Sequence, residues 1–152
     1  MYIIMKLVSA CLLGIRCTWR GNDSYRNERI IELSQSELLI PVCPEQLGGL
    51  PTPRPPQELQ STTGEDILDG KGTVKNQEGR DVTQHFIRGA HETLQIARRL
   101  DIDEFIGRFG SPSCGCDHIY DGSFSGKLVP GNGVTTALLA RNGIRVTSEH
   151  EL

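Results

Sequence analysis

Three cysteines in this chain, Cys11, Cys43 and Cys114, each follow a short apolar run. These runs cover residues 6–10, 38–42 and 105–109. If the runs are parallel strands, their carboxyl ends lie at one edge of one sheet, where open α/β folds bind their ligands. Three sulfur atoms converging at that edge indicate a soft metal centre with one coordination position left open for chemistry.

Polar residues that could assist such a centre lie next to these cysteines. The turn SPSCG at residues 111–115 contains two hydroxyls, those of Ser111 and Ser113, and such a turn can present side chains and backbone N–H groups to one ligand. Glu45 follows the second of the three cysteines by two residues, and a carboxylate beside a metal pocket can act as a general acid or base. The simpler alternative is a surface glutamate that caps a helix or pairs with Arg54.

The cysteine spacing favours a cluster over a structural zinc site. The chain has no C-x-x-C pair, which a zinc ribbon typically contains, and cysteines at three strand ends suit a larger group. A zinc ion held by three sulfur atoms and a water remains an alternative, because zinc and iron-sulfur clusters both accept thiolate ligands. Cys17 and Cys116 are spare thiols. Cys116, two residues past Cys114, could substitute as a ligand, but it ranks below the other three cysteines.

The elements that must position these residues alternate between strand and helix. The sequence predicts strands over residues 3–10, 38–42, 104–108 and 144–147, and helices over residues 28–37, 81–100 and 134–141. This order predicts a three-layer, Rossmann-like α/β fold with a mostly parallel sheet. The clearest helix is 81–100, where apolar residues recur at helical spacing after a candidate N-cap, Asp81. With 152 residues, we expect residues 1–152 to form a single domain.

A long Gly/Pro-rich loop interrupts this pattern at residues 48–79. Its first part, GGLPTPRPP at 48–56, can form neither a helix nor a central strand. Loops of this length in a compact domain are usually functional or disordered. Because this one begins beside the candidate ligand Cys43, we expect a functional lid, with disorder as the alternative.

Composition excludes several classes of function. A net charge of -3 gives no general attraction to DNA or to an anionic membrane. No apolar stretch approaches the ~20 residues of a membrane span, and the N-terminus lacks the features of a secretory signal, so we expect a cytoplasmic protein. Five cysteines in such a chain favour metal binding or thiol chemistry over a disulfide framework.

Several segments, in this order, resemble a bacterial and archaeal family long catalogued as a domain of unknown function, whose characterised members are thiouracil desulfidases. The similar segments are VSACLLG at 8–14, VCPEQLGGLPTPRPP at 42–56, DVT at 81–83, SPSCG at 111–115, IYDGSF at 119–124 and VPGNGV at 129–134. The resemblance implies an oxygen-sensitive 4Fe-4S cluster held by three cysteines, with a fourth iron that takes the substrate's sulfur. By matched position, the ligands are Cys11, Cys43 and Cys114.

The resemblance also implies catalytic residues and a substrate. A glutamate and a serine assist hydrolysis in the family, and these correspond to Glu45 and to Ser111 or, as second choice, Ser113. The implied reaction replaces the thiocarbonyl sulfur of a thiolated pyrimidine, either a thiouracil base or 4-thiouridine monophosphate, and releases hydrogen sulfide. Two departures from the family pattern concern substrate choice: Trp19 could stack on a base, and Arg108 could reach a phosphate.

Two other functions stay open at this point. One is a metal- or iron-sulfur-binding module without turnover, such as a sensor or carrier, and the other is a zinc hydrolase that uses the same three thiolates. A pure binding module needs only the thiols, so Glu45 and Ser111 favour an enzyme. Acid-labile sulfide distinguishes an iron-sulfur cluster from zinc.

Overall fold

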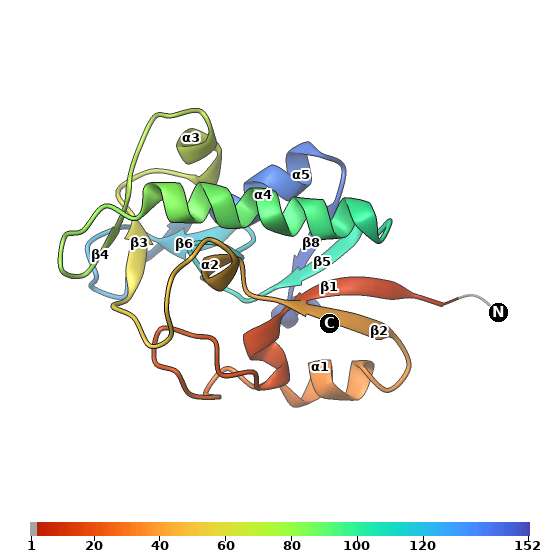
Figure 1. Cartoon of the computed structure of the whole chain (residues 1–152). Helices are drawn as coiled ribbons and strands as arrows, with labels where there is room; N and C mark the ends of the chain where they lie inside the picture. Colours follow the sequence, from red (N-terminus) through yellow and green to blue (C-terminus); the bar gives the residue numbers. More distant parts are fainter. Residues whose placement is uncertain (1–2) are drawn as a thin grey trace.

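Four parallel strands form the central sheet of the computed structural model, which describes residues 3–152 (Figure 1). They are β1 (Met5–Ser9), β2 (Leu38–Val42), β5 (Glu104–Gly107) and β8 (Arg145–Ser148), in the order β2-β1-β5-β8. Every pairing between neighbours is parallel. The predicted mostly parallel sheet is therefore confirmed, and each predicted strand is present, with ends that differ from the prediction except in β2.

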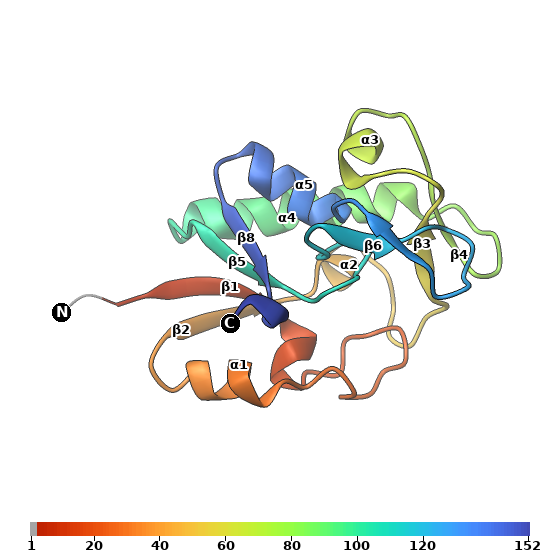
Figure 2. The same cartoon turned by 180° about the vertical axis from the view of Figure 1, so that it is seen from behind.

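Helices cover both faces of the sheet, which gives the three predicted layers (Figures 1 and 2). The helices α4 (Thr83–Arg99) and α5 (Val134–Arg141) lie on one face, and α1 (Glu28–Leu33) lies on the other. Neighbouring strand residues face opposite layers, so Leu7 packs in the main core with α4, whereas Val8 packs against Ile30 of α1. No helix within residues 3–152 is long and apolar enough to cross a membrane.

Two predicted helices are present with different ends. The helix α4 begins at Thr83, because the Asp81 carboxylate accepts the amide and the hydroxyl of Thr83 at 2.9 and 2.6 Å and stays outside the first turn. The helix α1 ends at Leu33, earlier than predicted. There the Ser34 hydroxyl donates to the carbonyl of Ile31 and competes with helical hydrogen bonding. The helix α5 has the predicted bounds.

The prediction of a loop over residues 48–79 is wrong for most of this segment. Residues 48–56 contain neither helix nor strand, as predicted. The remainder holds β3 (Gln57–Leu59), α3 (Gly64–Leu68) and β4 (Val74–Asn76). Because β3 and β4 pair antiparallel and Leu59 and Ile67 are buried in the main core, this part belongs to the packed fold and is no lid. Strands of three residues are too short for their alternation to be recognised in sequence.

A second small sheet was also not predicted from the sequence. It consists of β6 (His118–Tyr120) and β7 (Leu128–Pro130), which pair antiparallel. The side chain of Glu58 in β3 joins the two small sheets, since its Oε1 accepts the amides of Gly122 and Phe124 at 3.0 and 3.1 Å. The two sheets lie together beyond the carboxyl ends of the central strands (Figures 1 and 2).

A close helix contact fixes the start of α2 (Pro44–Leu47). Pro44 occupies the first helical turn, where its missing N–H is not needed. A Cβ added to Gly89 of α4 would lie 1.9 Å from the Pro44 carbonyl oxygen, so only glycine permits this approach. The contact therefore positions Cys43, which precedes α2, and Glu45, which lies within it.

Candidate active site

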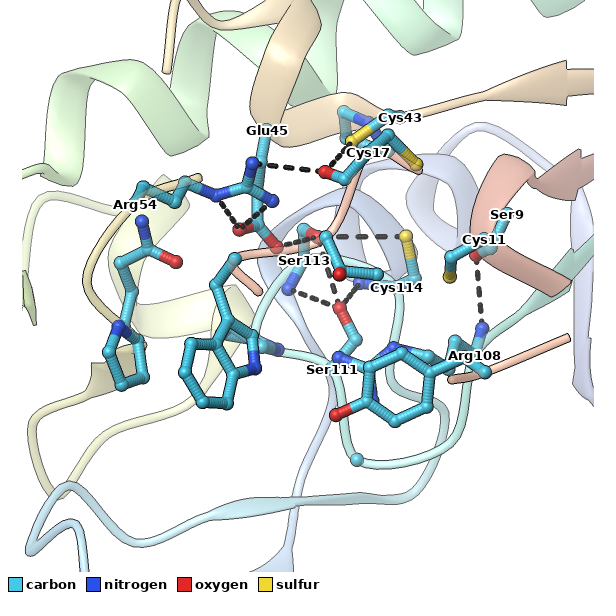
Figure 3. Close-up of a pocket in the computed structure, with 18 of the residues that line it drawn as sticks. Ser9, Cys11, Cys17, Cys43, Glu45, Arg54, Arg108, Ser111, Ser113 and Cys114 are labelled. Carbon is cyan, nitrogen blue, oxygen red and sulfur yellow. Dashed lines mark hydrogen bonds and ion pairs between the residues drawn. The ribbon is translucent and has the colours of Figure 1, made fainter. Parts of the chain in front are cut away.

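Three neighbouring strands end at one cavity. Cys11 follows β1, Cys43 follows β2 and Cys114 lies in the turn after β5, and β1 is the strand between the other two. All three cysteines line the same cavity, whose volume is about 300 Å³ (Figure 3). The structure thus brings together the three candidate ligands.

Each of these cysteines has its own backbone setting. Cys11 is buried in a short 3-10 helix, η1 (Ala10–Leu13). Gly14 ends this helix with a φ of 83°, a conformation that favours glycine. Cys43 is half-buried at the N-cap position of α2, and Cys114 is buried. The side chains therefore reach the cavity from three different elements.

Burial keeps two of these thiols protonated when no metal is bound. It raises the pKa of Cys11 to about 12 and the pKa of Cys114 to about 11, because a buried thiolate loses its hydration. Cys43 differs, since a hydrogen bond with the Cys17 side chain lowers the pKa of Cys43. A metal that binds here releases the remaining protons, because thiolates are the ligand form.

Glu45 is held at both carboxylate oxygens inside the cavity. Its Oε1 accepts a hydrogen bond from Arg54 Nε at 3.1 Å and forms an ion pair with Arg54 Nη2 at 3.0 Å. Its Oε2 accepts one from the Ser113 hydroxyl at 2.9 Å (Figure 3). Glu45 and Arg54 are each only 8% exposed. The simpler alternative for Glu45, a pair with Arg54, is therefore right about the contact, but the pair lies in the cavity wall and not on the surface.

Ser111 organises the turn that presents Cys114. Its Oγ accepts the backbone amides of Ser113 at 3.2 Å and Cys114 at 3.0 Å, and it lies 3.1 Å from the Ser113 Oγ. Because the Ser113 hydroxyl donates to Glu45, the Ser111 hydroxyl is the donor between the two serines. A chain of hydroxyls thus leads from Ser111 through Ser113 to the Glu45 carboxylate.

The start of α5 holds this serine turn in place. The amides of Val134 and Thr135 donate to the carbonyls of Pro112 and Ser113, both at 2.9 Å. A Cβ added to Gly133 would lie 2.6 Å from the Ser113 carbonyl carbon. The turn is therefore fixed against a helix terminus, and its serines have little freedom to move.

Arg54 links three segments around the cavity. Its Nη1 donates to the carbonyls of Cys17 and Pro51 and to the Thr52 hydroxyl, each at 3.0 Å. Together with the pair to Glu45, these contacts connect residues 48–56, α2 and the loop after η1. This linking role of Arg54 was not predicted from the sequence, although an arginine inside a rigid Pro-rich stretch is a signal that could have suggested it.

Replacing Arg54 by methionine is expected to destabilise the protein by about 3–5 kcal/mol, because it leaves the buried Glu45 carboxylate without its charge partner. Urea unfolding of the cluster-free protein measures this free energy. The matched control is Arg141→Met, which breaks an exposed ion pair with Asp69 and should change stability far less. Equal unfolding midpoints for Arg54→Met and wild type would show that the ion pair between Arg54 and Glu45 does not stabilise the cavity wall.

Aromatic side chains and two further arginines complete the cavity. The aromatic residues are Trp19, Tyr25, Tyr120 and Phe124. The guanidinium carbon of Arg20 lies 4.8 Å from the Trp19 ring centroid, and that of Arg108 lies 4.0 Å from the Tyr25 ring centroid. Arg20 is exposed, which places it at the mouth. Trp19 and Arg108 were selected from the sequence, but the others were missed. Tyr120 and Phe124 lie in the family-like segment IYDGSF, which was the signal that could have found them.

The remaining cysteines differ in their relation to the cavity. Cys17 is buried and lines it, whereas Cys116 is absent from its lining and donates to the Val146 carbonyl at 3.5 Å. Within residues 3–152, no three His, Cys, Asp or Glu side chains lie at the spacing of ligands to one metal ion. Three thiols spread around a cavity of about 300 Å³ fit a group of several atoms, and thiolates are the ligands that iron-sulfur clusters take.

Known proteins resemble this chain over nearly its whole length. A sequence model of a family described as 2-thiouracil desulfurase matches residues 7–151. A protein of Bacillus subtilis (strain 168), described as uncharacterized protein YbbK, is 45% identical over 148 residues, which are 97% of each chain. The solved structure of a protein named 4Fe-4S-dependent thiouracil desulfidase TudS (DUF523Vcz) is 40% identical, with a TM-score of 0.84 over 98% of this chain and 93% of that chain.

Proposed function

Because the chain belongs to the 2-thiouracil desulfurase family, we propose that it is a 4Fe-4S-dependent enzyme that removes sulfur from a thiolated pyrimidine. In the reaction, water replaces the thiocarbonyl sulfur: the carbon–sulfur bond breaks, a carbonyl forms, and hydrogen sulfide leaves, with no net oxidation or reduction. The observation that carries this proposal is the presence of the three candidate ligand thiols, the buried Glu45 carboxylate and the two serines Ser111 and Ser113 around one cavity.

Cys11, Cys43 and Cys114 are the residues that would hold the cluster. Three protein thiolates leave one iron of such a cluster free to act as a Lewis acid on the thiocarbonyl sulfur. Cys17 lies in the same cavity, where its carbonyl accepts a hydrogen bond from the Cys43 thiol at 3.6 Å. Its role in the proposal is therefore to contact a ligand and not to be one.

Glu45 is the proposed general base. Arg54 engages Oε1, so Oε2 is the oxygen that faces the serines and is left for proton transfer. There it takes a proton from the attacking water and returns one to the pyrimidine ring or to the leaving sulfur. The two fixed partners keep the carboxylate in one orientation, which removes the need to reorganise it during the reaction.

The two serines have distinct proposed roles. Ser113 touches Glu45 directly and orients its carboxylate. Ser111 lies one hydroxyl further along the chain of hydrogen bonds and fixes the amide of Cys114. The geometry therefore supports both serines selected from the sequence, with Ser113 nearer to the base than the preferred Ser111.

A binding module without turnover is the less supported function. Such a module needs thiols, but it gains nothing from a carboxylate buried against a serine, and burying charge without a chemical role is costly. The contact between Glu45 Oε2 and Ser113 therefore favours an enzyme over a sensor or carrier.

The substrate is proposed to be a thiolated pyrimidine in its nucleotide form, of the 4-thiouridine monophosphate type. The aromatic lining offers faces on which a pyrimidine ring can stack. Arg20 lies at the exposed mouth, where it can meet a phosphate that stays partly hydrated. A free base such as 2-thiouracil would use only the aromatic part of the site.

Sulfide release from 4-thiouridine monophosphate, 4-thiouracil and 2-thiouracil tests this choice of substrate under anaerobic conditions. We expect the nucleotide to have the lowest KM, and Arg20→Gln to raise that KM by up to about fivefold, as loss of one exposed charge contact predicts. The same variant should leave the KM for the free base 4-thiouracil unchanged. Equal KM values for base and nucleotide in the wild type would contradict the nucleotide preference.

A further inference from the structure

Arg108 is a cation in the cavity without a carboxylate partner among the described residues. Its one side-chain hydrogen bond within residues 3–152 is from Nη1 to the carbonyl of Phe109 at 3.3 Å. Arg54, the other arginine deep in the cavity wall, is neutralised by Glu45. The charge of Arg108 therefore stays available to whatever occupies the cavity.

The backbone and one aromatic ring fix the position of Arg108. Its amide donates to the Ser9 hydroxyl at 3.0 Å, which ties the residue after β5 to the end of β1, beside Cys11 (Figure 3). Its guanidinium carbon lies 4.0 Å from the centre of the Tyr25 ring. An aromatic face stabilises a cation by its quadrupole without cancelling the charge.

The groups around Arg108 are those of the proposed cluster site. Arg108 lines the same cavity as Cys11, Cys43 and Cys114. The hydrogen bond from its amide to Ser9 holds it at the end of β1, two residues before Cys11. Glu45 is already paired with Arg54, so the charge of Arg108 is left for the thiolates that a bound cluster would require.

We propose that Arg108 is the counter-cation of the cluster, and that its charge stabilises the thiolates of Cys11 and Cys114 and raises the cluster's reduction potential. This inference rests on the proposed function only in requiring that the cluster binds at Cys11, Cys43 and Cys114. Thiolates bring negative charge into a buried cavity, where an adjacent guanidinium offsets the loss of hydration. Reduction adds a further negative charge, which the same cation favours.

The test compares Arg108→Gln, Arg108→Lys, Arg20→Gln and the wild type after anaerobic reconstitution. Redox titration followed by electron paramagnetic resonance gives the midpoint potential, and competition with an iron chelator gives cluster retention. We expect Arg108→Gln to have a lower potential and at least about tenfold weaker retention, the loss expected when one charged interaction is removed. Arg108→Lys keeps the charge and should resemble the wild type.

Arg20→Gln is the matched control, because it removes an arginine charge from the mouth of the same cavity and should leave potential and retention unchanged. A wild-type potential in Arg108→Gln would overturn the proposal, as would equal changes in the glutamine and lysine variants. If Arg108→Gln binds no cluster, the lysine variant decides. A cluster bound by Arg108→Lys supports the proposal, and loss of the cluster from Arg108→Lys overturns it. Neither readout measures sulfide release, so a shifted potential without desulfidation would refute the proposed function alone.

Discussion

Replacing Glu45 by glutamine is expected to abolish sulfide release while the cluster stays bound. The amide keeps the volume of the side chain, its oxygen can still accept from Arg54, and its nitrogen can donate to the Ser113 oxygen. It has no basicity, however, and loss of a general acid or base typically lowers the rate by about 10²–10⁴-fold. Rates of sulfide release, together with iron and labile sulfide per chain, measure the two quantities separately.

Glu58→Gln is the matched control for that experiment. Glu58 is a second buried carboxylate that lines the cavity, but its Oε1 accepts the amides of Gly122 and Phe124 and has a structural role. Its replacement should lower sulfide release far less than Glu45→Gln does. Full activity in Glu45→Gln would remove Glu45 from the mechanism, and loss of the cluster in that variant would show that Glu45 serves the metal site instead.

Serine variants of Cys11, Cys43 and Cys114 should each lose the cluster and all sulfide release. Serine preserves the size of the side chain but is a poor ligand for iron, and each of the three thiols lies at a different strand end, so none can replace another. Cluster content follows from iron, labile sulfide and the visible absorption of the reconstituted protein.

Cys17→Ser and Cys116→Ser provide the controls within the same chain. Cys17 is the stricter one, since it lines the same cavity and contacts Cys43, whereas Cys116 is absent from the lining. Both variants should keep the cluster. Retention in Cys11→Ser combined with loss in Cys17→Ser would mean that the ligand set has been assigned wrongly.

The convergence of the three cysteines could be predicted from the sequence because it depends on chain direction alone. Once the apolar runs before Cys11, Cys43 and Cys114 are parallel strands, their ends must lie at one edge of the sheet. The alternation of strands and helices indicated that parallel order. The strands within residues 57–76 could not be predicted, because strands of three residues are too short to show an alternation of apolar and polar side chains. Their structure depends on packing against the main core.

The polar contacts of the site could not be predicted for a different reason. The bond between Ser113 and Glu45 joins residues 68 positions apart, and sequence spacing says nothing about such a contact. The environment of Arg108 likewise depends on Tyr25, which comes from a distant loop without a recognisable pattern. Residue type and order thus indicated which side chains carry the chemistry, while the tertiary fold decides which of them touch.

The central claim is that a 4Fe-4S cluster held in this cavity removes sulfur from a thiolated pyrimidine. The most direct test is an assay of iron and acid-labile sulfide on anaerobically reconstituted protein, followed by sulfide release from 4-thiouridine monophosphate and 2-thiouracil in the same sample. We predict iron and labile sulfide in equal amounts, at about four of each per chain for a 4Fe-4S centre, together with catalytic sulfide release. Zinc without labile sulfide, or a full cluster that releases no sulfide from either substrate, would contradict the claim.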